Sequence, residues 1–259
     1  NLGPTDVVVG KSTVPVGTAQ RLAERLLSAG SSATLAWNPE FLREGFAVKD
    51  TLSPDRLVFG VAEGAGHQHA LVALREVYAA AIAAGTPVVE TDLATAELVK
   101  TAANAFLATK ISFINAMSEI AEVTGANVTE LADAIGYDTR IGRRFLNAGV
   151  GFGGGCLPKD IRAFSARAEE LGLGSSVAFL GEVDAINLRQ RERVIARVIA
   201  DAGGDAVDLK VAVLGLAFKP QSDDVRDSPA LDVARGLAAA GAHVTAYDPQ
   251  AMGPALRRF

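Results

Sequence analysis

Cysteine is almost absent from this sequence: Cys156 is the only one in 259 residues. One cysteine cannot form an intramolecular disulfide, which fits a reducing compartment, so we expect a cytoplasmic protein. Long hydrophobic runs are absent too, and none approaches the ~20 apolar residues that span a bilayer. The chain does not open with a basic stretch followed by an apolar core, so we expect no signal peptide and no membrane partner.

Basic residues are in the minority, with 25 Lys and Arg against 30 Asp and Glu. The formal net charge of −5 leaves no basic face, so nucleic acid is not an expected partner. No metal site is predicted either. The overall composition is ordinary for a soluble globular protein, with 49% hydrophobic and 21% charged residues. The length allows one large or two medium domains with buried cores.

The first part of the chain alternates between short apolar runs and helical patterns. Strands are predicted at 6–10, 34–37, 56–61 and 87–90, and helices at 18–29, with Thr18 as N-cap, and at 69–84. Such alternation predicts an α/β region with a parallel sheet.

The middle of the chain reads as all-helical. Residues 92–124 contain no proline or glycine and predict one long helix, capped by Thr91 or Asp92. Further helices are predicted at 128–135, 158–171 and 176–201, and after them strand 210–214, helix 229–240 and strand 243–247. Because the last unit ends before it could close a sheet, we expect a fragment of a longer chain.

The stretch VVVGKST (7–13) has the Gly-Lys-Ser of a phosphate-binding loop. That motif needs a glycine five positions before Gly10, where Thr5 stands, and Pro15 interrupts the helix that should follow. We therefore reject a nucleotide-triphosphatase function. Ser12 and Thr13 still follow the carboxyl end of a predicted parallel strand, where open α/β sheets bind ligands. The alternative is a plain strand–turn–helix.

Two groups of polar residues have a functional and a structural interpretation. Glu40 could accept a proton or hold a water, and Glu44 could contact a ribose hydroxyl, but a solvated surface pair is favoured. Glu97, Lys100 and Asn104 share one helix face by their spacing. Lys100 and Asn104 could point into a site, although an exposed polar stripe is the commoner arrangement.

The stretch GVGFGGGCLPKD (149–160) places five glycines just before Cys156. Ordering glycines costs backbone entropy, so the run makes sense where backbone approaches a ligand or takes a positive φ. Pro158 suits the first turn of a helix, so Cys156 precedes a helix N-terminus, which favours a thiolate. Lys159 adds positive charge, and Asp160 could orient a water or a proton relay. A buried, inert cysteine is the alternative.

Together these motifs resemble the UDP-glucose/GDP-mannose dehydrogenase family, and most closely its UDP-glucose 6-dehydrogenase branch. The matching segments follow the family order across nearly the whole chain: STVPVGT (12–18), NPEFLREG (38–45), PDRLVFG (54–60), ELVKTAANAFLATKISFIN (97–115), RIGRRFLNAGVGFGGGCLPKD (140–160) and VAVLGLAFKPQSDDVRDSP (211–229).

The resemblance implies three segments. These are the C-terminal part of a Rossmann-like NAD-binding domain with a parallel sheet (1–90), a central all-helical dimerisation domain (91–203), and the start of a second Rossmann-like domain that binds the nucleotide sugar (204–259). It implies a homodimer through the central helix, NAD as cofactor and UDP-glucose as substrate. The family's G-x-G-x-x-G fingerprint is absent from these residues.

The reaction that the resemblance implies is a four-electron oxidation of the sugar C6 alcohol to a carboxylate with two NAD. Cys156 would attack the intermediate aldehyde and form a thiohemiacetal and then a thioester. Lys100 would stabilise oxyanions, Asn104 and Asp160 would hold a water or a substrate hydroxyl, and Glu40 would be the acid/base of hydrolysis. Thr13 completes the implied catalytic set.

The resemblance also implies two sets of binding residues. The cofactor contacts would be Ser12, Thr13, Val14, Glu44, Cys156, Lys159 and Arg226. The sugar-nucleotide contacts would be Glu40, Phe41, Leu42, Lys100, Asn104, Arg140, Phe145, Asn147, Gly149, Gly151, Phe152, Gly153, Phe218 and Lys219. Arg140 would reach the substrate across the dimer interface, and some family members carry lysine at position 147.

Two other functions stay open. A GDP-mannose 6-dehydrogenase would share the cysteine motif and mechanism, although STVPVGT and PDRLVFG favour the UDP-glucose branch. A dimerising helical scaffold without catalysis is the alternative for the fragment.

Overall fold

The computed structural model describes residues 2–64 and 66–258 of the chain. The chain forms two compact units, Asn1–Ala103 and Asn104–Phe259. The three segments 1–90, 91–203 and 204–259 stay a prediction of domain organisation.

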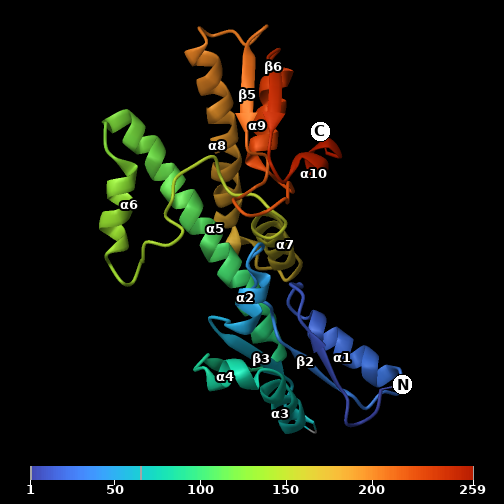
Figure 1. Ribbon diagram of the computed structural model, residues 1–259. Coiled ribbons are helices and arrows are strands. Elements are labelled where there is room, and N and C mark those ends of the chain that lie inside the picture. Colours follow the sequence, from blue (N-terminus) through green and yellow to red (C-terminus); the bar gives the residue numbers. More distant parts are fainter. Residues whose placement is uncertain (1, 65, 259) are drawn as a thin grey trace. The chain divides into compact units, whose positions relative to one another are not determined.

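A four-stranded sheet in the order β1-β2-β3-β4 organises the first unit, and β2 and β3 are labelled in Figure 1. Its strands are β1 (Val7–Gly10), β2 (Thr34–Trp37), β3 (Leu57–Val61) and β4 (Val88–Thr91). The accompanying helices are α1 (Thr18–Ser28), α2 (Ala47–Leu52), α3 (His67–Val77) and α4 (Ala79–Ala83). Strands β1 and β2 are parallel and are joined by α1, and β3 and β4 are parallel and are joined by α3 and α4.

The sheet contains one antiparallel pair that the alternation of strands and helices does not predict. Strands β2 and β3 pair through Ala36 with Val61 and Trp37 with Gly60. Their connection carries only the 6-residue helix α2, so the chain turns back beside β2 instead of crossing over. The α/β fold class is confirmed, with a parallel arrangement on each side of this pair.

Both faces of the sheet are covered, as the unbroken apolar sequence of β3 requires. Phe59 and its neighbours at alternate positions pack against α3 and α4, where Leu71 and Leu74 are buried. Val58 points to the other face, where it packs with Ala19 of α1 and Ala96 of α5 (Leu93–Thr124). The carboxyl ends of β1 and β2 therefore lie beside the start of α1 and the first turns of α5.

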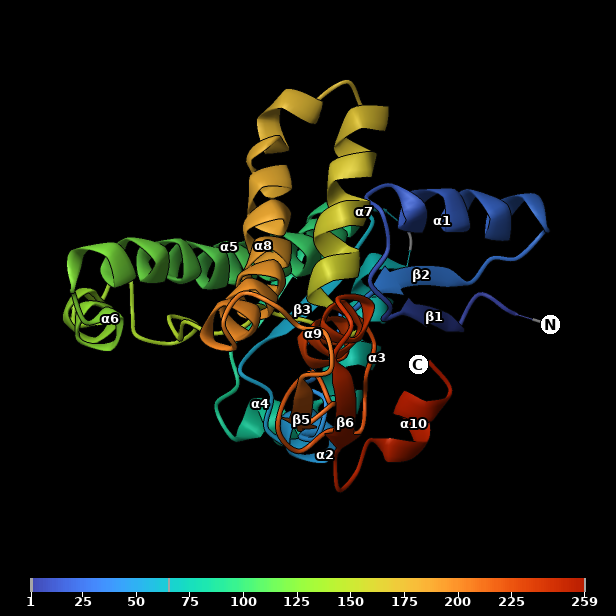
Figure 2. The same ribbon diagram turned by 90° about the horizontal axis from the view of Figure 1, so that it is seen from above.

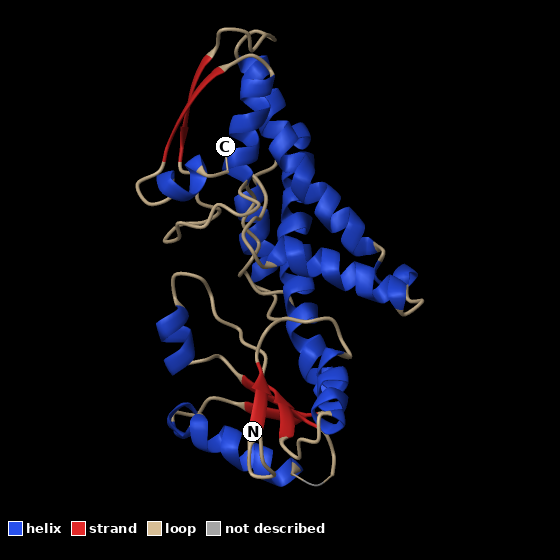
Figure 3. Cartoon of the chain, turned by 90° about the vertical axis from the view of Figure 1, so that its right-hand side faces the viewer, coloured by secondary structure: helices blue, strands red, loops and turns tan. Residues whose placement is uncertain are grey.

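The second unit contains most of α5 and a set of shorter elements. They are α6 (Val128–Gly136), α7 (Leu157–Glu170), the 3₁₀ helix η1 (Gly174–Val177), α8 (Phe179–Asp201), β5 (Lys210–Leu214), α9 (Pro229–Ala239), β6 (His243–Tyr247) and α10 (Met252–Leu256). Strands β5 and β6 form a parallel two-stranded sheet, drawn as the isolated red pair in Figure 3.

Helices α5, α7 and α8 share one core, and α7 and α8 lie side by side (Figure 2). Ala108 of α5, Ile161 of α7 and Leu180 of α8 meet there with Phe152 from the glycine-rich segment. The far half of α8 packs against α9 and the β5–β6 sheet through a separate cluster around Leu237. Helix α8 thus contacts both the helical core and the C-terminal elements.

The structure tests the predicted caps at two helix starts. Helix α1 begins at Thr18, and the capping position belongs to Gly17 with φ 95°, so the prediction of Thr18 as N-cap is wrong. For α5 the alternatives resolve to Asp92, whose carboxylate accepts from the backbone N–H and hydroxyl of Thr95 at 2.8 Å each.

The other differences between the predicted and the observed helices are local. The predicted helix 69–84 is two helices with a break at Tyr78, which has φ −101° and ψ 17°. The predicted helix 176–201 is η1 followed by α8, and the short helices α2 and α10 are not predicted. In the part of the chain that the structure describes, no helix combines the length and apolarity needed to cross a bilayer.

Candidate active site

The turn after β1 begins with a polar cluster. Lys11 donates from Nζ to Oδ1 of the buried Asn38 at 2.6 Å and to the Tyr78 hydroxyl at 2.7 Å. The structure places Ser12 exposed and Thr13 half-buried immediately beyond, at the carboxyl end of β1, while Val14 packs into the sheet core. The two hydroxyl side chains are thus presented at the ligand-binding edge of the sheet.

A carboxylate from α5 caps the start of α1. The oxygens of Glu97 accept from the backbone N–H of Gly17 at 2.7 Å and of Ala19 at 2.6 Å. Glu97 is only 2% exposed, and Lys100 and Asn104 are 6% and 7% exposed, so the interpretation of these residues as an exposed polar stripe is wrong. The first amides of α1 are occupied by the protein and are not available to an external anion.

Lys100 and Glu40 face one another in the first unit. The Lys100 ammonium lies 3.8 Å from Oε1 of Glu40, whose other oxygen accepts from the backbone N–H of Leu42 at 2.6 Å. The ammonium also lies 5.5 Å from the centre of the Phe41 ring, and the Arg56 guanidinium stacks on the same ring at 3.8 Å. A buried cation beside a carboxylate can stabilise developing negative charge and exchange a proton.

The loop that carries Glu40 and Glu44 is fixed by one buried carboxylate. Asp50 accepts from the backbone N–H of Arg43 and twice from its guanidinium, at 2.8, 2.9 and 2.6 Å. The Arg43 side-chain hydrogen bonds hold the pKa of Asp50 at about 2, although burial acts in the opposite direction. Glu44 is half-buried in this loop. Neither residue of the Arg43–Asp50 pair is predicted from the sequence.

In the second unit, Cys156 occupies the capping position of α7. Its side chain is exposed, and its carbonyl accepts from the backbone N–H of Asp160 at 2.8 Å. The Asp160 carboxylate is 3% exposed and accepts from the Asn104 amide at 2.6 Å, with the Lys159 ammonium at 3.0 Å from its other oxygen. The structure therefore does not bury Cys156, and it places a buried Asn104–Asp160 pair at the first turn of the helix that Cys156 caps.

The glycine run, residues 149–155 just before Cys156, packs closely against the segment 216–229. A Cβ on Gly154 would lie 2.7 Å from the Phe218 ring, and Gly154 has φ 87°. A Cβ on Gly155 would overlap the Arg226 guanidinium, and one on Gly153 the Asp227 carbonyl. Because these three glycines lack a side chain, the 216–229 segment of the same chain can pack directly against their backbone. Gly149 differs, because a Cβ there would meet nothing within 4 Å.

The remaining predicted contact residues lie around this run or on the surface. Arg140 is exposed and is paired with Asp138 at 2.6 Å. Phe145 is 40% exposed with φ 66°, and Asn147 accepts from Arg143 at 2.8 Å. The Lys219 ammonium lies 5.3 Å from the centre of the Phe218 ring, Gly149 donates to Asn115, and Leu42 is exposed in the loop between β2 and α2.

Comparison with known proteins places this chain in a family. Three domain models of the UDP-glucose/GDP-mannose dehydrogenase family match the chain in order: the NAD binding domain at residues 1–82, the central domain at 94–189 and the UDP binding domain at 212–259.

Two curated relatives and one solved structure are similar along almost the whole chain. The UDP-glucose 6-dehydrogenase of Rhizobium meliloti (strain 1021) is 46% identical over 97% of this chain and 57% of its own length. UDP-glucose 6-dehydrogenase 1 of Arabidopsis thaliana is 44% identical over 97% of this chain and 53% of its own. The UDP-glucose dehydrogenase structure from the hyperthermophilic archaeon Pyrobaculum islandicum has a TM-score of 0.88 at 41% identity, over 97% of this chain and 56% of that one.

The chain spans about half the length of these curated relatives. Its α/β first unit, its long central helix and its C-terminal parallel strand pair follow the order that the resemblance implied. The domain models match in that same order and leave few residues uncovered. The chain belongs to the UDP-glucose/GDP-mannose dehydrogenase family.

Proposed function

We propose that the protein containing this chain oxidises the C6 alcohol of UDP-glucose to a carboxylate with NAD, and that Cys156 is its nucleophile. The observation that carries this proposal is the exposed Cys156 at the start of α7, the helix whose first turn carries Asp160 of the buried Asn104–Asp160 pair. The names of the relatives, which are 43–46% identical over nearly all of this chain, favour UDP-glucose as the substrate.

The residues of the first unit fit a dinucleotide at the carboxyl edge of the sheet. The exposed Ser12, the half-buried Thr13 and the half-buried Glu44 offer hydroxyl and carboxylate groups there. Val14 contributes an apolar contact, and Cys156, Lys159 and Arg226 are proposed as further cofactor contacts from the second unit. Since Glu97 occupies the first amides of α1, the pyrophosphate would not bind at that helix start. Two NAD molecules would each take up one of the two hydrides that the sugar carbon loses.

Cys156 makes the second oxidation possible. Loss of a hydride and a proton from the C6 alcohol gives an aldehyde, and the Cys156 sulfur then bonds to the aldehyde carbon to form a thiohemiacetal. The former aldehyde oxygen takes up a proton in that step, and loss of a second hydride from the carbon and of this proton from the hydroxyl oxygen gives a thioester. Water then attacks the thioester, the C–S bond breaks, and the carboxylate and the free thiol are released.

The other residues assigned to the reaction have distinct proposed tasks. The buried Lys100 ammonium stabilises the oxyanions formed at C6, since a cation shielded from water acts strongly on developing charge. Glu40, which faces Lys100 at 3.8 Å, is the acid/base of thioester hydrolysis, and Thr13 lies at the same edge of the sheet. Asn104 and Asp160 hold a water or a substrate hydroxyl beside the first turn of α7.

Sugar-nucleotide contacts are proposed for the loop after β2, for α5 and for the second unit. The first loop offers Glu40, Phe41 and Leu42, and α5 offers Lys100 and Asn104. The second unit offers Arg140, Phe145, Asn147, Gly149, Gly151, Phe152, Gly153, Phe218 and Lys219. The close packing of the glycine run against the 216–229 segment supports a binding surface formed by these two segments together.

A homodimer through α5 is the proposed assembly. Phe106, Phe113 and Ile120 recur every seven residues and are 65%, 47% and 56% exposed, which leaves an apolar stripe along the helix. A second copy of this chain would cover it, and Arg140 would then serve the partner's substrate. The exposed thiol of Cys156 supports a reducing, cytoplasmic location.

The test is turnover of the full-length protein. We expect two NADH for each UDP-glucose and expect Cys156→Ser to stop turnover or trap an intermediate. Ser165→Ala, on the same helix, is the control, since the Ser165 hydroxyl bonds only one turn back to the Ile161 carbonyl. Two NADH per sugar at the normal rate from Cys156→Ser would exclude the thioester route, and faster oxidation of GDP-mannose would overturn the substrate.

A further inference from the structure

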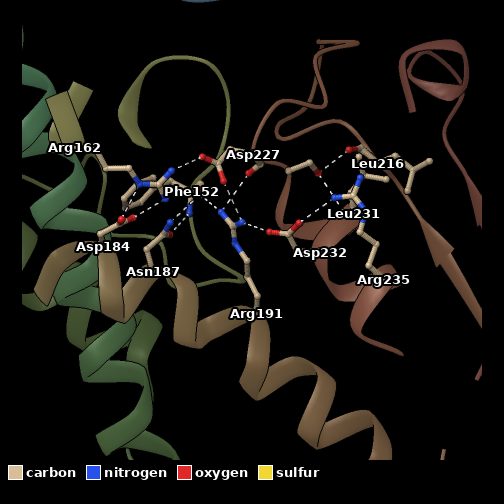
Figure 4. Close-up of polar contacts among 11 residues, drawn as sticks. Phe152, Arg162, Asp184, Asn187, Arg191, Leu216, Asp227, Leu231, Asp232 and Arg235 are labelled. Atoms are coloured by element: carbon tan, nitrogen blue, oxygen red, sulfur yellow. Dashed lines mark hydrogen bonds and ion pairs between the residues drawn. The ribbon is translucent and has the colours of Figure 1, made fainter. Parts of the chain in front are cut away.

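The backbone N–H and carbonyl of Phe152, inside the glycine run, are held by two side chains from α8 (Figure 4). Asn187 accepts from the Phe152 N–H at 2.6 Å and donates to the Phe152 carbonyl at 3.1 Å. Arg191, one turn further along α8, donates to the same carbonyl at 3.0 Å. Gly151 makes room for this contact, because a Cβ there would lie 2.5 Å from Oδ1 of Asn187. The conformation of the run is therefore set from α8.

Arg191 also binds the segment that covers the run. Its guanidinium donates to the Asp227 carboxylate at 3.3 Å and to the Asp227 carbonyl at 3.2 Å, and it pairs closely with Asp232 of α9. Arg226, next to Asp227, accepts from the Gly154 N–H at 2.8 Å through its carbonyl. One guanidinium thus joins the glycine run to the chain just before α9.

The Asp227 carboxylate continues the connection to the helix that Cys156 caps. Its second oxygen accepts from Arg162 of α7 at 3.2 Å, and Arg162 is itself held by Asp184 of α8 at 2.8 and 3.1 Å. Asp227 has φ 51°, a left-handed conformation that is uncommon outside glycine. Asp227 therefore uses one oxygen for α7 and the other for α8 (Figure 4).

Stability alone does not account for this network. Arg191 is 3% exposed, and its Nε is buried with no hydrogen-bond acceptor among the described residues. Buried ion pairs often add little to stability, because desolvation of the two charges offsets their attraction. The guanidinium does fix the directions of its partners: Nη2 donates to the carbonyls of Phe152 and Asp227, and Nη1 bonds the carboxylates of Asp227 and Asp232, so one planar group orients all of them relative to each other.

We propose that Arg191 and Asp227 are positioning residues for the reaction: they hold the glycine run and the 226–229 segment together in the form that binds the sugar nucleotide. This inference rests on the proposed function, which assigns sugar-nucleotide contacts to the run. Neither side chain needs to touch the substrate. Each acts through the backbone of the glycine run, which contacts the substrate.

The test compares Arg191→Lys and Asp227→Asn with wild type in the full-length protein. Lysine keeps the charge but loses the planar fork, and asparagine tolerates the left-handed backbone while losing the charge. We expect the dissociation constant for UDP-glucose, measured by calorimetry, to rise about tenfold in each variant, the effect of losing one buried hydrogen bond. We also expect faster amide hydrogen exchange at Phe152 and Gly154.

Arg197→Gln is the matched control, because Arg197 lies on the same helix in an exposed pair with Asp201. A purely structural role would lower the midpoint of unfolding and leave the dissociation constant of the folded protein within about twofold of wild type. That result, or unchanged exchange at Phe152 and Gly154, would overturn the inference. If wild type itself does not bind UDP-glucose, the proposed function fails, while the exchange rates still decide whether Arg191 and Asp227 hold the run.

Discussion

The side-chain amide of Asn104 on α5 donates to the carboxylate of Asp160 on α7 at 2.6 Å, and both side chains are buried. Asp160 belongs to the first turn of the helix that Cys156 caps, so the pair fixes this turn against the long central helix. A buried carboxylate that loses a donor loses part of the compensation for its desolvation, although the Lys159 ammonium would remain 3.0 Å from the other oxygen of Asp160.

Asn104→Ala should therefore lower the free energy of unfolding by about 1–3 kcal/mol, measured by urea denaturation. The control is Ser118→Ala on the same helix, where a hydroxyl bonds the local Asn115 carbonyl; we expect a change of at most about 0.5 kcal/mol. Equal effects of the two substitutions would contradict the importance of the Asn104–Asp160 contact.

Glu97→Gln should destabilise the first unit by about 1–2 kcal/mol. A glutamine has one acceptor oxygen, so the N–H of either Gly17 or Ala19 would lose its partner and face an amide NH₂. Calorimetric unfolding and the hydrogen exchange of the Ala19 amide measure the two effects. Glu24→Gln, in the exposed pair with Gln20 on α1, is the control and should change neither.

Gly154→Ala should cost about 1–3 kcal/mol, because the new methyl group would meet the Phe218 ring at 2.7 Å and alanine disfavours a φ of 87°. Gly149→Ala, in the same run, has open space and should leave the unfolding free energy nearly unchanged. If both variants unfold like wild type, the run does not need its glycines for packing against the 216–229 segment.

Asp248 should make the second unit less stable in acid. Burial raises the pKa of its carboxyl, but the backbone N–H groups of Leu216, Ala217, Gln250 and Ala251 together lower it from 3.8 to about 2. A carboxyl whose pKa is lowered by folding stabilises the protein above its ordinary pKa and loses that contribution as the pH falls through the lowered value. The stability difference between wild type and Asp248→Asn should therefore be constant above about pH 5 and shrink between about pH 4 and pH 2.

Urea unfolding at pH 6, 4 and 2 would follow this difference. Asp208→Asn, in an exposed pair with His243, is the control and should track wild type over the acid range. A difference that grew toward pH 2 would show that the sign is wrong.

Phe106→Glu and Phe113→Glu should each convert the proposed dimer into a monomer in sedimentation equilibrium, because a charge in the centre of an apolar interface is desolvated without a partner. Val77→Glu, a 75% exposed apolar residue of α3, introduces the same charge away from this stripe and should leave the dimer intact. Dimers that persist in both phenylalanine variants would place the interface elsewhere.

Long periodic patterns were enough to predict most elements of this fold. The uninterrupted 92–124 pattern predicts α5 to within a residue, and KVAVL and HVTAY predict β5 and β6 with their observed bounds. The break at Tyr78 was not visible, because it accompanies a hydroxyl bonded to Asn38, 40 residues away. The antiparallel pairing of β2 with β3 was likewise not predictable, since direction depends on the path of the connection.

The candidate site, like the fold, was predictable from the sequence only in part. Helical spacing places Lys100 and Asn104 on one face of α5, and Pro158 places Cys156 at a helix start. Burial of that face, the capping role of Glu97 and the anchors Asn187 and Arg191 depend on partners 35–80 residues away. No local pattern distinguishes such residues from ordinary polar positions of a helix.

The hydrogen bonds from Gly17 and Ala19 to Glu97 span 80 and 78 residues of sequence. During synthesis, α1 leaves the ribosome long before its capping carboxylate, and a short helix without tertiary support is marginal in water. The start of α1 can therefore become fully ordered only after β2, β3, β4 and the first turns of α5 have been made. Folding of this unit should be slow for its size, and a nascent chain ending at residue 92 should leave the first turn of α1 open to proteases.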